Sequence, residues 1–132
     1  MGKSKYDKYL VKSPLRGETP NTPPIYMSNK LVPESKILVQ SHWVCEIPTP
    51  DPKMAAGHSH DFDEIIMYIG ADPDNPEYLG AEIEGFMGDE VQITDNTSAI
   101  FIPKNVKHGL TRWRKFEKPH IMLAIKLNNG NP

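Results

Sequence analysis

Histidine and acidic residues gather in one short segment of the chain, Gly57-His-Ser-His-Asp-Phe-Asp-Glu64. His58, His60 and Glu64 have the same parity, so an extended backbone would point all three side chains to one face, with the histidines about 7 Å apart. Two imidazoles and a carboxylate form the ligand set of a facial triad, which leaves positions on a metal open to water, substrate or dioxygen. The segment predicts a site for one divalent metal ion. The alternative is a polar loop that happens to carry histidines and acids.

A later segment supplies a fourth candidate ligand. Ile100-Phe-Ile-Pro103-Lys-Asn-Val-Lys-His108 places a histidine five residues after a proline that ends an apolar run. A turn after Pro103 would direct His108 back into the core, toward the first segment.

The two segments together resemble the paired motifs of the cupin superfamily. The first cupin motif has the form Gly-x5-His-x-His-x3/4-Glu-x6-Gly, and His58, His60 and Glu64 match it at the shorter spacing between histidine and glutamate. Pro52 stands in the place of the leading glycine, and Gly70 falls one residue early.

The second cupin motif is Gly-x5-Pro-x-Gly-x2-His-x3-Asn, and Pro103 and His108 match it in spacing. Thr97 replaces the first glycine, Asn105 the second, and Arg112 the asparagine. Asn105 is the mildest of these changes, because asparagine tolerates the left-handed backbone conformation that the motif glycine supplies.

The resemblance covers about residues 36–127, and all four metal-ligand positions of the family are filled. Residues 72–80 look like an enlarged loop compared with compact members. The resemblance implies an all-β, jelly-roll cupin barrel (a double-stranded β-helix). It also implies one divalent transition metal, Fe, Mn, Ni or Zn, held by His58, His60, Glu64 and His108. A cupin that has lost its metal is the alternative.

The remaining sequence is typical of such a β architecture. Thirteen prolines and nine glycines in 132 residues break helices and favour turns. Apolar, β-branched and alternating stretches predict short strands at 36–47, 58–70, 81–87, 90–94, 99–102, 110–114 and 120–127. The last strand, which we expect to complete the core, carries Ile121, Leu123, Ile125 and Leu127 on one face at a period of two.

Three further residues are candidates for catalytic roles in the pocket. By parity, Arg112 shares a strand face with His108, and Tyr68 shares one with Glu64, while His42 lies on an earlier strand. Arg112 could bind a carboxylate through two hydrogen bonds, Tyr68 could act as an acid, and His42 could carry protons near neutral pH. The alternatives are a solvated arginine, a core tyrosine and a structural histidine, and a bulge would reverse the parity.

Four other residues have simpler expected roles. His120 begins the last strand, where it would be structural or would reach the cavity as a proton carrier. Trp43 and Trp113 are expected in the core or against a partner subunit. Cys45 is the single cysteine, which excludes an internal disulfide, and we expect it to be a buried, small apolar side chain.

Three regions divide the chain. Residues 1–30 are basic, contain prolines and show no sustained apolar period, so they predict an arm that is either a loosely docked tail or packs on a second subunit. Residues 31–127 form the predicted barrel, and residues 128–132 a frayed tail.

Charge and composition limit the partners. Lys and Arg number 15 against 17 Asp and Glu, for a formal net charge of −2, which is unlike a nucleic-acid-binding protein. No apolar run approaches the ~20 residues that span a bilayer, and no secretory signal opens the chain, so we expect a cytoplasmic protein with no membrane partner. By analogy with the family we expect a homodimer that binds a small molecule.

The resemblance implies a menu of reactions rather than one. Dioxygenation, isomerisation, decarboxylation and lyase chemistry all occur in the superfamily, and a metal would act as Lewis acid and template for a small, anionic organic substrate. Two other classes stay open. One is a non-catalytic cupin that binds or senses a small ligand, and the other is a structural cupin whose dimer arm is the function.

Overall fold

The computed structural model describes residues 4–12, 23–49 and 52–132. Residues 13–22 of the predicted arm, with Pro14 and Pro20, therefore lie outside the described residues. The described elements follow the order η1 (Asp7–Tyr9), β1 (Ile25–Met27), β2 (Leu38–Val44), α1 (Pro52–Ala56), β3 (Glu64–Gly70), β4 (Tyr78–Met87), β5 (Glu90–Asn96), β6 (Ser98–Ile102), β7 (His108–Phe116) and β8 (His120–Lys126).

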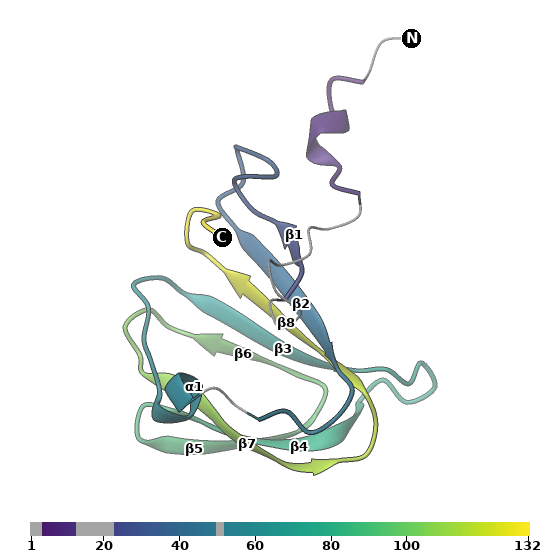
Figure 1. Cartoon of the computed structure of the whole chain (residues 1–132), viewed down its shortest axis with the longest axis vertical. Coiled ribbons are helices and arrows are strands. Elements are labelled where there is room, and N and C mark those ends of the chain that lie inside the picture. The colour runs from purple at the N-terminus through teal and green to yellow at the C-terminus, as the bar shows by residue number, and fades with distance from the viewer. Residues whose placement is uncertain (1–3, 13–22, 50–51) are drawn as a thin grey trace.

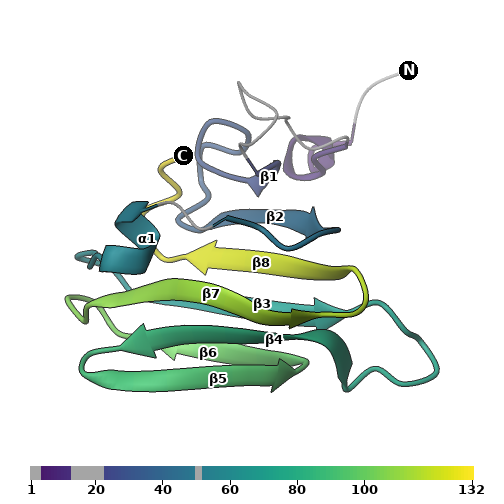
Figure 2. The same cartoon turned by 60° about the horizontal axis from the view of Figure 1, so that its bottom comes forward.

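The strands form two antiparallel sheets that face each other (Figure 1). Sheet A has five strands in the order β1-β2-β8-β3-β6, and sheet B has three in the order β5-β4-β7. Sheet A is the wider sheet, so β1 and β2 extend past the last strand of sheet B (Figure 2). The all-β jelly-roll architecture expected from the sequence is confirmed.

Turn-forming residues end the strands as predicted. Pro103 follows β6, and Gly88, with φ at +62°, makes the turn between β4 and β5. Strands are present in all seven predicted regions, although the second begins at Glu64 rather than near His58. Within the described ranges, no helix is long and apolar enough to cross a membrane.

Three elements were not predicted, namely η1, β1 and α1. Residues 25–27 of the expected arm form β1, which pairs with β2 at the edge of sheet A. The short helix α1 follows the proline-rich loop, and Gly109 of β7 allows it to approach, because a Cβ there would overlap the carbonyl oxygen of Met54.

The core fills the space between the two sheets. Its buried side chains include Ile66 and Tyr68 of β3, Ile83 of β4 and Trp113 of β7. Trp113 is thus a core residue, which is one of the two placements expected from the sequence. Trp43 and Cys45 are exposed, so the expectation of a buried cysteine was wrong.

Strand β8 contributes to the core with the face opposite to the one its apolar pattern suggested. The residues of β8 that pair with the inward positions of β3 are His120, Met122, Ala124 and Lys126. Their partners are Gly70, Tyr68, Ile66 and Glu64, of which Tyr68 and Ile66 are part of the core. Because strand side chains alternate, Ile121, Leu123, Ile125 and Leu127 point away from sheet B. The sequence pattern identified a real face but not the side on which it lies.

The C-terminal residues are ordered rather than frayed. The Asn29 amide donates to the carbonyl of Gly130 at 2.8 Å, and the Asn29 side chain donates to the carbonyl of Asn129 at 3.0 Å. These bonds fasten the end of the chain to the turn after β1.

Candidate metal centre

The four predicted ligands come from one loop and the first residues of two strands at one end of the barrel. Glu64 begins β3 and His108 begins β7, while His58 and His60 lie in the loop between α1 and β3. His58 and His108 exchange two backbone hydrogen bonds of 2.9 Å, which join the two histidine segments directly. These two hydrogen bonds therefore bring histidines that are far apart in the sequence into one cluster.

Two backbone positions shape these loops. Gly57, next to His58, has φ at +93°, and a Cβ there would collide with the Phe86 ring. Asn105 has φ at +67°, which confirms the expected left-handed conformation at the substituted motif glycine. The backbone N–H of Asn105 donates to the carbonyl of His60 at 2.6 Å, so this turn fixes the loop that carries His60.

The side chains converge as a metal site requires. One ring nitrogen from each of His58, His60 and His108 lies within 4.8 Å of the others. The Oε1 atom of Glu64 lies 3.5 Å from Nε2 of His108 and 3.8 Å from Nε2 of His60. His60 is also stacked on Phe62, with ring centroids 4.7 Å apart, which restrains the imidazole.

The donor atoms fit a bound cation. Within the described chain, Nε2 of His108 and Oε1 of Glu64 are buried and have no hydrogen-bond partner. The Nδ1 atom of His108 is 2.9 Å from the carbonyl of Val106, an acceptor that holds the proton on Nδ1 and leaves the Nε2 lone pair free for a metal. Unpartnered polar atoms are costly in a protein interior, and a metal ion would satisfy both.

Protonation also suits metal binding. Burial lowers the pKa of the His58 and His60 imidazoles below the usual histidine value. Burial alone would raise the pKa of the Glu64 carboxyl, but the adjacent His108 reverses this, and the pKa lies below its usual value. Near neutral pH the centre therefore offers neutral imidazoles at His58 and His60 and an ionised carboxylate, the forms that bind metals. The pKa of His108 is raised by its interaction with Glu64, so a proton on His108 would compete with a metal ion at this residue.

Lys126 is a residue of this site that the sequence did not indicate. It lies directly opposite Glu64 on β8 and on the same inward face. Its positive charge acts electrostatically on all four candidate ligands. No ion pair of Lys126 within 4.0 Å is found in the described part of the chain. Only the pairing of β8 with β3 brings this lysine to the centre, and that pairing is not readable from motif spacing.

A small cavity of about 30 Å³ adjoins His108 inside the barrel. Its walls are mostly apolar, with polar groups from Tyr68, Gln92 and Thr94. The Tyr68 hydroxyl is buried without a hydrogen-bond partner in the described structure, and burial raises its pKa far above the ordinary value. Tyr68 is therefore a neutral phenol that can donate to, or accept from, a molecule in the cavity.

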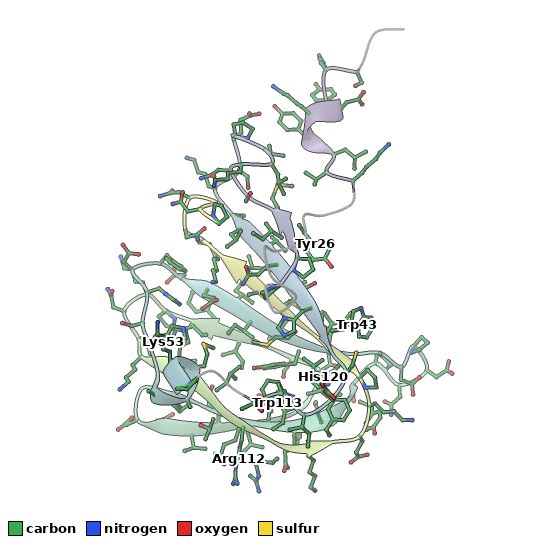
Figure 3. All side chains as sticks on the ribbon, in the orientation of Figure 1. Tyr26, Trp43, Lys53, Arg112, Trp113 and His120 are labelled. Atoms are coloured by element: carbon green, nitrogen blue, oxygen red, sulfur yellow. The ribbon has the colours of Figure 1, made fainter. Side chains whose placement is uncertain are left out.

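Arg112 does not reach the cavity. A register shift between β4 and β7 brings Leu110 opposite Gly85 and Arg112 opposite Glu84, so the side-chain parity changes along β7. The Arg112 side chain is 63% exposed and its Nη2 lies 3.5 Å from Glu84 on the outer face of sheet B (Figure 3). The bulge named as an alternative has thus removed Arg112 from the pocket that its parity predicted.

The other two histidines lie away from the metal cluster. His42 is exposed on β2, in the row of Met122 and Tyr68, and does not line the cavity. His120 is fully buried between the sheets, where Trp113 donates its indole N–H to Nε2 at 3.1 Å (Figure 3). Nδ1 of His120 faces the carbonyl of Lys118 at 3.3 Å, so His120 is a structural, neutral histidine.

Comparison with known proteins identifies the fold. No family model matches the sequence, and no curated protein matches it. An oxalate oxidase in complex with glycolate matches with a TM-score of 0.57 and 15% identity, over 96% of this chain and 62% of that chain. A cupin protein from Bacteroides fragilis matches with a TM-score of 0.51 and 14% identity, over 92% and 90%.

Coverage differs among the structural neighbours. This chain spans only 40% of a chain from the crystal structures of two DMSP lyases, at a TM-score of 0.43 and 12% identity. At such low identities the likeness concerns the fold and not the activity. With two facing antiparallel sheets and two histidine segments joined at one end of the barrel, this chain has the cupin fold.

Proposed function

We propose that this cupin binds one divalent transition metal through His58, His60, Glu64 and His108 and acts as an enzyme on a small anionic substrate. The observation that carries the proposal is the pair of buried, unpartnered atoms, Nε2 of His108 and Oε1 of Glu64, beside two further imidazoles. Nitrogen and oxygen ligands of this kind suit Fe, Mn, Ni or Zn. A bound ion would supply Lewis acidity and a template for the substrate.

The protein groups around the site support a small anionic ligand. Lys126 brings a positive charge next to the four ligands, on the inward face and without an ion-pair partner among the described residues. It takes the role that the sequence suggested for Arg112, because a carboxylate near the metal would be attracted to its ammonium group. The cavity of about 30 Å³ limits the part that enters to a few atoms.

Tyr68 supports a catalytic rather than a purely ligand-binding role. Its phenol lies on the same inward strand face as Glu64 and has no partner of its own within the described structure. Because it stays protonated at neutral pH, it can donate a hydrogen bond to an oxygen that gains negative charge during a reaction. A non-catalytic ligand-binding cupin is the alternative, and it would retain ligand binding with no turnover.

Metal analysis of purified variants tests the site. The full chain, loaded with Fe, Mn, Ni or Zn and desalted, should retain about one equivalent of metal. His108→Ala should retain far less, because it removes a ligand and leaves Glu64 unpaired. His42→Ala is the matched control, since His42 is exposed and outside the cluster, and it should bind metal like the parent. Full stoichiometry in His108→Ala, or no binding by the parent, would contradict the proposal.

A further inference from the structure

Strand β5 carries polar side chains on the face that points into the barrel. In the ladder with β4, Thr94 lies opposite Ile83 of the core, and Gln92 shares the face of Thr94. Val91 and Ile93, which alternate with them, are 69% and 42% exposed. An antiparallel strand with one solvated face ordinarily has the reverse pattern, with apolar residues inward and polar residues outward. The reversal places two hydrogen-bonding side chains where apolar ones would complete the core.

These two polar side chains are free to bind a ligand. Both line the small cavity beside His108, together with Tyr68 and its unpartnered hydroxyl. Among the described residues, no hydrogen bond joins the side chain of Gln92 or Thr94 to another group. The Gln92 amide and the Thr94 hydroxyl can each donate and accept hydrogen bonds. A molecule in this cavity would thus meet three neutral hydrogen-bonding groups.

A larger groove of about 580 Å³ shares part of its wall with this cavity. It lies between β5 and β6, which are edge strands of different sheets on the same side of the barrel (Figure 2). Four residues, Met87, Gln92, Thr94 and Ile100, line both the groove and the small cavity. The inward side of β5 is therefore common to the space that adjoins a candidate metal ligand and to a groove at the barrel edge.

The groove suits neutral hydroxyl groups rather than an anionic group. Its polar lining consists of Gln92, Thr94, Asn96 and Ser98, which are neutral, and of Asp95. No Lys or Arg is among the described residues that line it. Amide and hydroxyl side chains match hydroxyl groups, which also both donate and accept hydrogen bonds, whereas the Asp95 carboxylate repels an anion.

We propose that Gln92 and Thr94 are specificity-determining residues that bind the hydroxyl groups of a polyhydroxy carboxylate, an inference that rests on the proposed function. The carboxylate lies near the metal ligands, where Lys126 supplies positive charge. The polyol chain passes Gln92 and Thr94 into the groove, where Asp95 disfavours the opposite orientation. Because the small cavity of about 30 Å³ holds only a few atoms, a longer substrate needs the groove.

Calorimetry on the zinc-loaded full chain with two probes tests the proposal. D-Gluconate and lactate share an α-hydroxy carboxylate, so the metal and Lys126 meet the same group in both, but only gluconate has a polyol chain. The parent should bind gluconate at least tenfold more tightly than lactate, because additional hydrogen bonds form. Gln92→Leu combined with Thr94→Val should lose this preference and should bind lactate like the parent.

Matched variants control for the loss of a polar side chain. Gln40 lies on β2 and Thr111 on β7, and neither lines the cavity or the groove. Gln40→Leu combined with Thr111→Val should therefore keep the preference for gluconate. Thr94→Ser, which retains the hydroxyl, should also keep it.

A second measurement does not depend on the folding of a variant. In NMR spectra of the nitrogen-15-labelled, zinc-loaded parent, the side-chain amide signals of Gln92 should shift much more with gluconate than with lactate. The side-chain amide signals of Gln40 should stay in place with both probes. If the double variant is misfolded by circular dichroism, this comparison decides.

Two results would overturn the inference while leaving the metal site intact. One is a parent that holds zinc and binds the two probes with equal affinity. The other is a folded double variant that keeps the full preference for gluconate. Zinc content is measured on the same samples, and a parent that retains no zinc would contradict the proposed metal site and this inference together.

Discussion

Lys126 and Glu64 face each other across two paired strands, β8 and β3. The positive charge of Lys126 has opposite effects on the metal ion and on the anionic substrate that the candidate site would bind. A metal cation is repelled by Lys126, whereas an anionic substrate is attracted to it. At the effective dielectric of a partly buried site, each effect is on the order of 1–2 kcal/mol.

Lys126→Met should therefore change two affinities in opposite directions. Metal binding, measured by competition with a chelator, should become tighter, because the variant keeps a side chain of similar length without its charge. Binding of acetate, used as a small carboxylate probe, to the metal-loaded protein should weaken by roughly tenfold when measured by calorimetry. Lys104→Met, at an exposed position of the Pro103–His108 turn, should change neither affinity. A Lys126→Met protein that binds acetate like the parent would exclude the proposed role.

Asn105 tests whether the turn between β6 and β7 depends on one backbone conformation. Because its φ is +67°, Asn105→Gly should leave the free energy of unfolding within about 0.5 kcal/mol of the parent. Asn105→Val should destabilise by about 1–2 kcal/mol, since a β-branched residue is disfavoured there. Urea unfolding of the three proteins provides the comparison. Equal stability of the valine variant would show that the left-handed conformation is not required in solution.

At the scale of elements, β7 and β8 meet in the buried pair of Trp113 and His120. Burial lowers the pKa of His120, and a protonated ring could not accept the indole hydrogen bond. Because the folded pKa lies below the unfolded value of about 6.5, the stabilisation is complete above that pH. It is lost progressively as the pH falls through the folded pKa.

The pH dependence of stability should therefore depend on this histidine. His120→Gln keeps an acceptor for Trp113 but does not titrate, so it should lose less unfolding free energy than the parent between about pH 7.5 and about pH 5. His42→Gln should also lose less than the parent, because burial and the nearby His120 lower the pKa of His42 as well, but it leaves the Trp113–His120 hydrogen bond in place. Parallel stability curves for the parent and His120→Gln would show that His120 is not the titrating group.

The pairing of the strands also explains which residues of the candidate site could be predicted from the sequence and which could not. The cluster of His58, His60 and His108 was predictable, because their spacing and the turn after Pro103 are local properties. Arg112 was misplaced, because a bulge that depends on pairing with β4 reversed its direction. Lys126 was missed, because only the pairing of β8 with β3 brings it opposite Glu64.

Strand β8 shows the same limit of sequence patterns in predicting the fold. Its period of two was correct, but Ile121, Leu123 and Ile125 point outward, and the inward face carries His120 and Lys126. Alternation alone shows that two faces differ and not which one is buried in the single chain.

At the scale of the whole molecule, the cupin fold separates three surfaces by chemistry. The end of the barrel gathers histidines and a carboxylate, the outer side of sheet B carries charged pairs, and the outer side of sheet A carries apolar residues such as Leu123, Met67 and Phe101. Because the candidate metal centre and the outer side of sheet A lie on different sides of that sheet, each can be altered without the other.

The most direct test of the metal centre is a crystal structure of the metal-loaded protein with anomalous diffraction recorded at the absorption edge of the metal. We predict one strong anomalous peak at the end of the barrel, about 2.0–2.2 Å from imidazole nitrogens of His58, His60 and His108 and from a Glu64 oxygen. No peak there, or a peak held by other residues while these four stay unligated, would contradict the assignment.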